Sequence, residues 1–303
     1  MESKKPATLI VIQGPTAVGK TSVSIELAKK YNCDIISADS RQFYKEIPIG
    51  TAAPKFEEMD GVKHHFIGNI SIENYYNVSM FEMEVLSLLK NYFKNNNIMI
   101  MVGGSGLYID AVCKGIDRLP DIDLNLRESL KSLFENEGLK AIQEKLLNLD
   151  PEYYKQVDIN NPKRILRALE VCLQTGKTYT SLRKGKPAKR PFKIIKIGLE
   201  MDRKQLNERI ERRLYSMLEE EWLDEVKSVI KYRNVNALNT VGYKELFKYL
   251  DGDWDFQTAI EKIKVNTRRF AKRQITWFKR YDDIVWFSPK DTDNIVEFLD
   301  NSM

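Results

Sequence analysis

Cysteine and histidine are scarce in this chain, which has three cysteines and two histidines in 303 residues. Cys33, Cys113 and Cys172 lie far apart, are odd in number and form no C-x-x-C pair, which argues against a disulfide framework and a zinc site. We expect all three to be small buried hydrophobic side chains. His64 and His65 lack a third ligand at a recognisable spacing, so we expect them to pack or form hydrogen bonds rather than bind metal.

The chain also lacks a long run of apolar residues. The apolar stretch in MESKKPATLIVIQG is shorter than a signal-peptide core and far shorter than the about 20 residues of a membrane-spanning helix. We therefore expect a cytoplasmic protein that has no contact with a membrane. With 43% hydrophobic and 30% charged residues, the composition is that of a globular protein of one large domain or two modest ones.

Neither sign of charge dominates, because the formal net charge is only +5, and an excess this mild identifies no partner. Its distribution is uneven. Residues 181–193 include six basic residues and no acid, and residues 262–280 include eight basic residues and no acid beside large aromatic side chains. The second segment suits the phosphates and bases of RNA, or else forms a solvated basic face with aromatic residues in the core.

Short apolar segments alternate with helical patterns in the first part of the chain. Residues 8–13, 34–38 and 98–102 are predicted buried strands, whereas residues 21–31 and 81–95 have helical spacing. This alternation predicts an α/β fold, with a P-loop NTPase-like parallel sheet flanked by helices. Ligands of such folds bind at the carboxyl ends of the strands.

A different pattern begins near residue 118. Apolar residues recur at helical spacing from residue 125 to 176, and Asn161 and Pro162 are an N-cap and N1 pair for a helix that stops at Gly176. We predict an all-helical insertion domain over residues 118–193. The core then comprises residues 1–117 and 194–303, with a strand over 193–199, a long helix capped by Asp202, and a helical tail.

The most specific motif is GPTAVGKT, which fits G-x-x-x-x-G-K-[ST] between a predicted strand and a predicted helix. In such an ATP-binding motif the backbone N–H groups converge on phosphate oxygens and the helix N-terminus adds positive potential, so a chance glycine-rich turn is a poor alternative. Lys20 supplies a full charge, and the Thr21 hydroxyl is a candidate Mg²⁺ ligand. The predicted diphosphate- or nucleotide-binding residues are Gly14, Pro15, Thr16, Ala17, Val18, Gly19, Lys20 and Thr21.

P-loop nucleotidases usually have an aspartate at the end of a strand to hold the metal, but the third predicted strand ends in GGSG instead. Asp39, in SADSRQFY, is the only carboxylate closely following an early strand. It could help to hold Mg²⁺, act as a general base, or cap a helix. The segment GGSGLY brings the Ser105 hydroxyl to the same edge of the sheet, or is only a strand-to-helix turn.

In order, the segments GPTAVGKT, SADSRQFY with IGTAAP, VGGSGLY, NPKRILRALEV with TGKT, NTVGYKE and AKRQITWFKR closely resemble the tRNA dimethylallyltransferase family, also called the IPP transferase family. The resemblance covers residues 14–280. It implies Mg²⁺-dependent transfer of a dimethylallyl group from dimethylallyl diphosphate to N6 of the adenine at tRNA position 37, next to the anticodon. It also implies a monomer whose P-loop core is interrupted by a helical insertion that contacts the anticodon stem-loop.

The resemblance also implies roles for individual residues. Asp39 would accept the proton of the adenine amine, and Lys20 with the loop would hold the diphosphate. At least one of Arg209 and Arg213 would reach the diphosphate, although the resemblance does not say which. Ser105 stands where the family more often has threonine, which keeps the catalytic hydroxyl but loses a methyl group. The residues implied to contact tRNA are Asp39, Ser40, Arg41, Gln42, Ser105, Arg127, Lys163, Arg164, Ile165, Leu166, Arg167, Asn239, Thr240, Val241, Gly242, Tyr243, Lys244, Lys272, Arg273, Gln274, Ile275, Thr276, Trp277, Phe278 and Lys279.

Three other functions stay open on the sequence. A prenyltransferase acting on free adenine nucleotides would share the core, but it would not require the insertion or the basic tail. A small-molecule or nucleotide kinase would use ATP at the loop, and would need the metal-binding carboxylate that the third strand lacks. A nucleic-acid-binding module would use the loop only as a regulatory switch.

Overall fold

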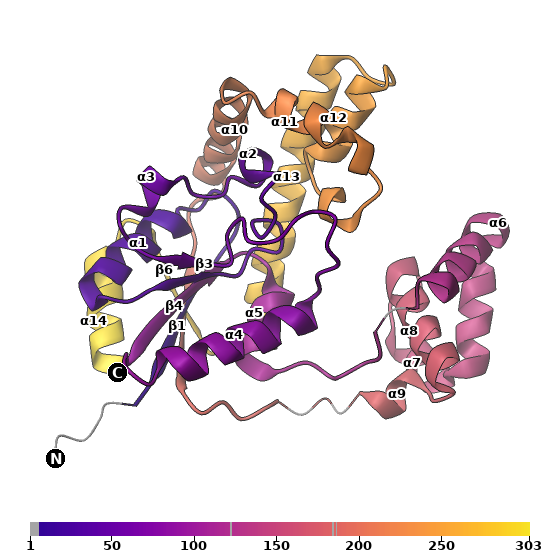
Figure 1. The fold of residues 1–303 in the computed structure, drawn as a ribbon, viewed down its shortest axis with the longest axis horizontal. Coiled ribbons are helices and arrows are strands. Elements are labelled where there is room, and N and C mark those ends of the chain that lie inside the picture. The colour runs from indigo at the N-terminus through magenta and orange to yellow at the C-terminus, as the bar shows by residue number, and fades with distance from the viewer. Residues whose placement is uncertain (1–5, 122, 184, 186) are drawn as a thin grey trace. The chain divides into compact units, whose positions relative to one another are not determined.

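The computed structural model describes residues 6–121, 123–183, 185 and 187–303 (Figure 1). The chain forms two compact units, residues 1–114 with 189–303 and residues 115–188, against a predicted insertion of 118–193. We call them the core unit and the helical unit. Within the described ranges, no helix is both long enough and apolar enough to cross a membrane.

The core unit is built on a parallel sheet, which confirms the predicted α/β fold. Its strands have the order β3-β2-β4-β1-β5-β6, and every pairing is parallel. The central strand β1 pairs over its full length with β4 on one side and β5 on the other. The strands are β1 (Thr8–Gln13), β2 (Ile35–Ser37), β3 (His64–His65), β4 (Ile98–Gly103), β5 (Lys193–Leu199) and β6 (Ile284–Phe287).

Helices cover both faces of this sheet. The side chains of β1 point alternately to the two faces, and they pack in a different apolar cluster on each. Ile10 and Ile12 pack in the cluster that includes α1 (Lys20–Tyr31) and α14 (Thr292–Ser302). Leu9 and Val11 pack in the cluster that includes α4 (Val78–Tyr92) and α5 (Gly106–Lys114). All four side chains are fully buried, so β1 lies at the centre of the core and fixes the loop that follows it.

A third apolar cluster gathers the remaining helices of the core unit around Trp222 and Tyr243. Both rings are fully buried, and they contact each other edge to face at 6.0 Å between centroids. These helices form the upper right part of the core unit in Figure 1. They are α2 (Pro48–Thr51), α10 (Arg203–Glu219), α11 (Trp222–Ser228), the 3₁₀ turns Ile230–Tyr232 and Asn236–Leu238, α12 (Tyr243–Leu250) and α13 (Phe256–Phe278), while α3 (Phe56–Met59) lies outside the cluster.

The helical unit contains α6 (Leu124–Leu149), α7 (Pro151–Gln156), α8 (Pro162–Thr175) and α9 (Tyr179–Leu182). Gly138, at φ +80°, interrupts α6 and divides it into two helical segments. The start of α8 is as predicted, because the Asn161 side chain accepts a hydrogen bond from the Arg164 N–H. Its predicted end is also confirmed, with Gly176 at φ +66°.

The prediction of a wholly helical tail is wrong, because β6 lies between α13 and α14. This strand has only four residues and forms an edge of the sheet, as does the two-residue β3 on the opposite side. Strands this short show little of the alternation by which longer strands are recognised. All three cysteines are buried free thiols, as expected.

Candidate active site

Three loops meet at the carboxyl edge of the sheet, after β1, β2 and β4. They contribute Thr16, Asp39 and Ser105 to the wall of a cavity of about 470 Å³. The cavity continues between the helices of the third cluster, where Ile210, Leu214, Met217, Trp222, Val241, Ile263 and Phe270 supply apolar wall. Residues of the GPTAVGKT, SADSRQFY and GGSGLY segments are therefore brought together at a space large enough for a small ligand, whereas the cavity lining includes no residue of NPKRILRALEV.

The loop after β1 has the conformation that its glycines allow. Gly14 has φ +157°, and a Cβ built on it would lie 2.6 Å from the Leu199 carbonyl oxygen, so no larger residue fits beside β5. Gly19 has φ +108° and leads directly into α1, whose first residue is Lys20. The Lys20 ammonium donates to the Pro15 carbonyl at 2.8 Å. The loop thus presents a cation and a helix N-terminus together, as a phosphate site requires.

Lys20 does not line the cavity, but its acidity is altered by its surroundings. Burial lowers its pKa to about 8, the nearby Asp39 carboxylate opposes that shift, and the Arg213 guanidinium adds to it. Lys20 is therefore still mainly protonated at neutral pH, and an anion beside it would favour the charged form further.

Asp39 lies in a tight turn after β2, and not at a helix N-terminus. Its Oδ1 accepts a hydrogen bond of 3.0 Å from the Arg41 N–H. The adjacent Ser40 is held by Ser105, whose Oγ accepts the Ser40 N–H at 2.9 Å and donates to the Ser40 hydroxyl at 3.1 Å. The predicted Ser105 hydroxyl thus fixes the turn that carries Asp39.

Arg209 and Arg213, four residues apart on α10, both contact the loop after β1. Arg213 donates to the Thr16 hydroxyl and to the Thr51 carbonyl, each at 3.2 Å. Arg209 donates from Nε to the Ala17 carbonyl at 2.7 Å, but it is exposed. Only Arg213 of these two lines the cavity, where burial lowers the pKa of its guanidinium.

The predicted Mg²⁺ ligand Thr21 is an exposed residue in the first turn of α1. In the described part of the chain no three His, Cys, Asp or Glu side chains cluster as a metal site would need. A Mg²⁺ ion that bridges phosphates requires only one or two protein oxygens beside its waters. The Thr21 hydroxyl and the Asp39 carboxylate are oxygen donors of that kind, although they follow strands β1 and β2, which are separated in the sheet by β4.

The residues predicted to contact tRNA differ in exposure. Several are exposed, namely Lys163, Arg164, Asn239, Lys244, Lys272, Arg273, Thr276 and Lys279. Others are partly exposed, namely Asp39, Ser40, Arg41, Gln42, Ser105, Arg127, Leu166, Arg167, Thr240, Val241, Ile275 and Trp277. The remainder, Ile165, Gly242, Tyr243, Gln274 and Phe278, are buried. Because only one face of a helix meets solvent, continuous segments cannot bind RNA along their whole length.

Two of the residues implied to contact RNA, Gln42 and Trp277, also make contacts within the protein. Gln42 accepts from the Ser37 hydroxyl at 3.0 Å and donates to the Ala52 carbonyl at 3.0 Å. Trp277 donates from its indole nitrogen to Asp110 at 3.0 Å, and the Arg280 guanidinium lies 3.7 Å from its ring centroid. The first contact fixes the loop after β2, and the second anchors the end of α13 on α5.

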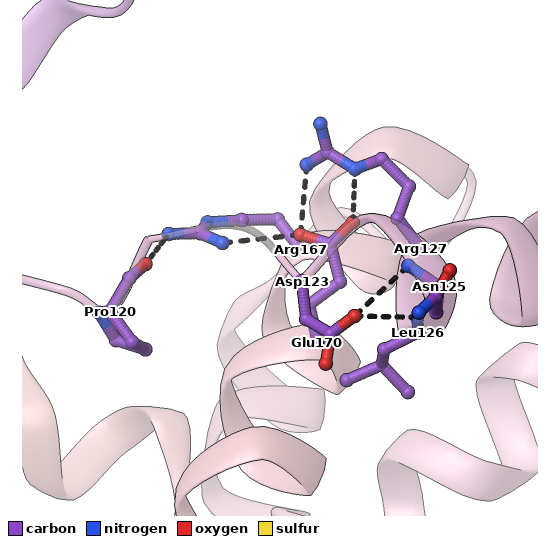
Figure 2. Close-up of polar contacts among 7 residues, drawn as sticks. All are labelled: Pro120, Asp123, Asn125, Leu126, Arg127, Arg167 and Glu170. Carbon is purple, nitrogen blue, oxygen red and sulfur yellow. Dashed lines mark hydrogen bonds and ion pairs between the residues drawn. The ribbon is translucent and has the colours of Figure 1, made fainter.

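In the helical unit, two predicted RNA-contacting arginines share one buried carboxylate (Figure 2). Arg127 donates to both oxygens of Glu170, at 2.6 and 2.9 Å. Arg167 donates to Glu170 at 3.2 Å and to the Pro120 carbonyl at 3.0 Å. Glu170, which the sequence did not single out, therefore sets the positions of both guanidinium groups.

Glu225 is a second acid that sequence reasoning missed. Its carboxylate accepts hydrogen bonds from the Ile49 and Gly50 N–H groups, at 2.7 and 2.9 Å, and from the Tyr243 hydroxyl. It thereby holds the Gly50 segment at the cavity wall. One signal was present, because Glu225 stands between Trp222 and Val226 at the spacing of a buried helix face.

The fold and this cavity define an α/β protein of the P-loop type. A family model described as IPP transferase matches residues 42–281. The chain is 49% identical to tRNA dimethylallyltransferase 1 of Bacteroides thetaiotaomicron, over 96% of this chain and 95% of that protein. The chain belongs to the IPP transferase family.

Solved structures agree with that assignment. The tRNA isopentenylpyrophosphate transferase of Bacillus halodurans is 35% identical and superposes with a TM-score of 0.72, over 97% of this chain and 96% of that one. A eukaryotic dimethylallyltransferase, described as acting on tRNA, superposes with a TM-score of 0.78 at 27% identity, over 95% of this chain and 75% of that one.

Proposed function

We propose that this protein is a tRNA dimethylallyltransferase. It transfers the dimethylallyl group of dimethylallyl diphosphate to N6 of the adenine at position 37 of tRNA, next to the anticodon, and releases diphosphate. The observation that carries this proposal is the cavity, which joins a phosphate-binding loop, a carboxylate and an apolar wall. The tRNA dimethylallyltransferases to which the chain is similar support the choice of donor and acceptor.

The loop end of the cavity suits the leaving group. As the bond between carbon and oxygen breaks, negative charge builds on the departing diphosphate. Lys20, Arg213 and the N-terminus of α1 surround the loop after β1 and would stabilise that charge, and preorganised stabilisation of this kind is usually the largest contribution to catalysis. A Mg²⁺ ion at Thr21 would neutralise further charge on the diphosphate.

The apolar wall suits the carbon chain of the donor. Ile210, Leu214 and Met217 recur at helical spacing on α10, beside Arg213, and all line the cavity. A donor whose diphosphate lies on the loop would bury its hydrocarbon against this wall. Burial of apolar surface contributes roughly 25 cal/mol per Å², and it also keeps water from the reacting carbon.

Asp39 suits the acceptor. The amine of adenine is a weak nucleophile because its lone pair is conjugated with the ring. A carboxylate that removes its proton as the new bond forms accelerates such a step by roughly 10²- to 10⁴-fold. The adenine must leave its stack to enter the cavity, which is easiest in an unpaired loop such as the anticodon loop.

The test is incubation of the protein with dimethylallyl diphosphate, Mg²⁺ and unmodified tRNA, followed by mass analysis of the nucleosides. We expect one dimethylallyl group on adenosine, and none on a tRNA whose adenine next to the anticodon is replaced by guanine. Prenylation of AMP offered in place of tRNA would indicate an adenylate prenyltransferase. Phosphoryl transfer from ATP offered in place of the donor would indicate a kinase. No modified nucleoside at high enzyme concentration would contradict the proposal.

Three further features belong to the proposal and rest on the family resemblance. The enzyme requires Mg²⁺ and acts in the cytoplasm as a monomer. Its helical unit binds the anticodon stem-loop of the tRNA. Removal of divalent ions with a chelator should abolish product formation, and addition of Mg²⁺ should restore it.

A further inference from the structure

We propose that Gln274 is a positioning residue for prenyl transfer, which sets the diphosphate-binding loop relative to the loop that carries Asp39. The proposal rests on the proposed function. It concerns a buried side chain of α13 that is far in sequence from both loops.

Both polar atoms of the Gln274 amide are used inside the protein. Its Oε1 accepts a hydrogen bond of 2.8 Å from the Thr16 N–H, in the loop after β1. Its Nε2 donates a hydrogen bond of 2.9 Å to the Gly104 carbonyl, in the loop after β4. Because a backbone N–H can only donate and a carbonyl can only accept, these two partners determine which way the amide points. One side chain therefore joins the two loops.

The loop after β4 is shaped to admit this amide. A Cβ built on Gly104 would lie 2.2 Å from the Gln274 Nε2 and 3.5 Å from the Gly14 carbonyl oxygen. A larger residue at position 104 would therefore push the side chain out of its place between the loops. The contact with the Gln274 amide therefore accounts for the glycine at position 104.

The connection continues from Gly104 to the proposed base. The next residue, Ser105, accepts the Ser40 N–H at 2.9 Å, and its own N–H donates to the Ala38 carbonyl at 3.3 Å. Ala38 and Ser40 flank Asp39 on both sides. Displacement of Gly104 would therefore displace the carboxylate, while the loop after β1 stays attached to its own strand.

Prenyl transfer requires that spacing to be correct. The amine must approach the carbon from the side opposite the departing diphosphate, while Asp39 reaches the proton of the amine. An error of about 1 Å in such an alignment lowers a rate by roughly 10²-fold. The contact also means that the Thr16 N–H is already used by Gln274 and is not free to donate to a diphosphate.

The first experiment compares the wild-type enzyme with Gln274→Met, which keeps the length of the side chain but removes both hydrogen bonds. We expect kcat for tRNA prenylation to fall about 10- to 100-fold. The dissociation constant of inorganic pyrophosphate should change less than about threefold, because Lys20 and Arg213 still hold the diphosphate. The matched control is Gln257→Met, an exposed glutamine of the same helix, which should leave both quantities unchanged.

A double-mutant cycle with Asp39→Asn separates positioning from a merely structural role. The Asp39→Asn enzyme has no carboxylate to position. Adding Gln274→Met to it should therefore lower kcat by less than about threefold, as measured in single-turnover assays. Equal losses of kcat in the two backgrounds, or wild-type kcat in Gln274→Met itself, would overturn the inference. If Gln274→Met does not fold, Gln274→Glu enters the same cycle, because its carboxylate keeps the acceptor but loses the donor to Gly104. A wild-type enzyme that forms no prenylated tRNA would instead refute the proposed function.

Discussion

Arg213 donates a hydrogen bond of 3.2 Å to the hydroxyl of Thr16, across 197 positions of sequence. Arg213 lines the cavity, whereas Arg209 lies on the outer side of the same loop. We therefore predict that Arg213→Met raises the dissociation constant of inorganic pyrophosphate at least tenfold, since a hydrogen bond to a charged group contributes about 1.5–3 kcal/mol. Arg209→Met should raise it less than about fivefold, on the scale of an exposed ion pair of about 0–1 kcal/mol. Calorimetric titration measures both, and equal effects would contradict this assignment.

Lys20 should make donor binding depend on pH. Its pKa in the free enzyme is lowered to about 8, so the proportion of protonated Lys20 falls as the pH rises above that value. A bound diphosphate favours the protonated form, and we predict a constant affinity for dimethylallyl diphosphate below about pH 8. Above it the affinity should fall by up to about tenfold per pH unit. Titrations of the enzyme with dimethylallyl diphosphate between about pH 6.5 and 9.5 test this prediction. The decline of affinity above about pH 8 should be absent from Lys20→Met.

The same lowered pKa has a consequence for stability. Because the folded pKa lies below the unfolded one, folding disfavours the charged form at low pH. That cost is constant below about pH 8 and diminishes as the pH rises from the pKa of the folded protein toward the ordinary lysine pKa of 10.5. The free energy of unfolding of the wild type, relative to Lys20→Met, should therefore increase with pH across this window.

Asp39→Asn removes the proposed proton acceptor while keeping its shape. We predict that kcat for tRNA prenylation falls roughly 10²- to 10⁴-fold, with little change in the dissociation constant of tRNA. The control is Asp224→Asn, which changes an exposed carboxylate that pairs with Lys227 in its own helix and should show no loss. Single-turnover kinetics and a filter-binding assay measure the two quantities. Normal turnover by Asp39→Asn would show that another group takes the proton.

Glu170→Ala should loosen the helical unit. The Glu170 side chain is only 4% exposed and neutralises two arginines, so its loss leaves both without their shared anion. Loss of one partner from a buried pair costs about 3–5 kcal/mol, but the arginines are themselves 41% and 28% exposed, and we expect about 2 kcal/mol. Hydrogen exchange of the α8 amides measures this cost. Glu135→Ala, at an exposed pair on α6, should cost less than about 0.5 kcal/mol.

Local patterns were sufficient for much of the fold. The strand over residues 8–13 has the predicted bounds, because a fully apolar segment before a glycine loop is informative without any partner. The cap at Asp202 and the helix after it are also as predicted. By contrast, β3 and β6 owe their strand conformation to pairing with β2 and β5, which no local pattern records.

The candidate site shows the same limit. The motifs identified the loop after β1 and the turn at Asp39, since each is contiguous in sequence. The role of Gln274 depends on Thr16, 258 positions away, and that of Glu225 on Ile49, 176 positions away. The resemblance placed Gln274 and Phe278 in an RNA-contacting segment, but the rotation of α13 turns both side chains inward.

The position of β1 bears on how the chain acquires its structure during synthesis. One neighbour of β1, β4, precedes the helical unit, and the other, β5, follows it. A ribosome therefore completes the whole helical unit while one edge of β1, all of whose residues are buried in the folded protein, is still unpaired. Exposed strand edges of this kind promote aggregation. That edge of β1 can pair only after residues 193–199 have been synthesised.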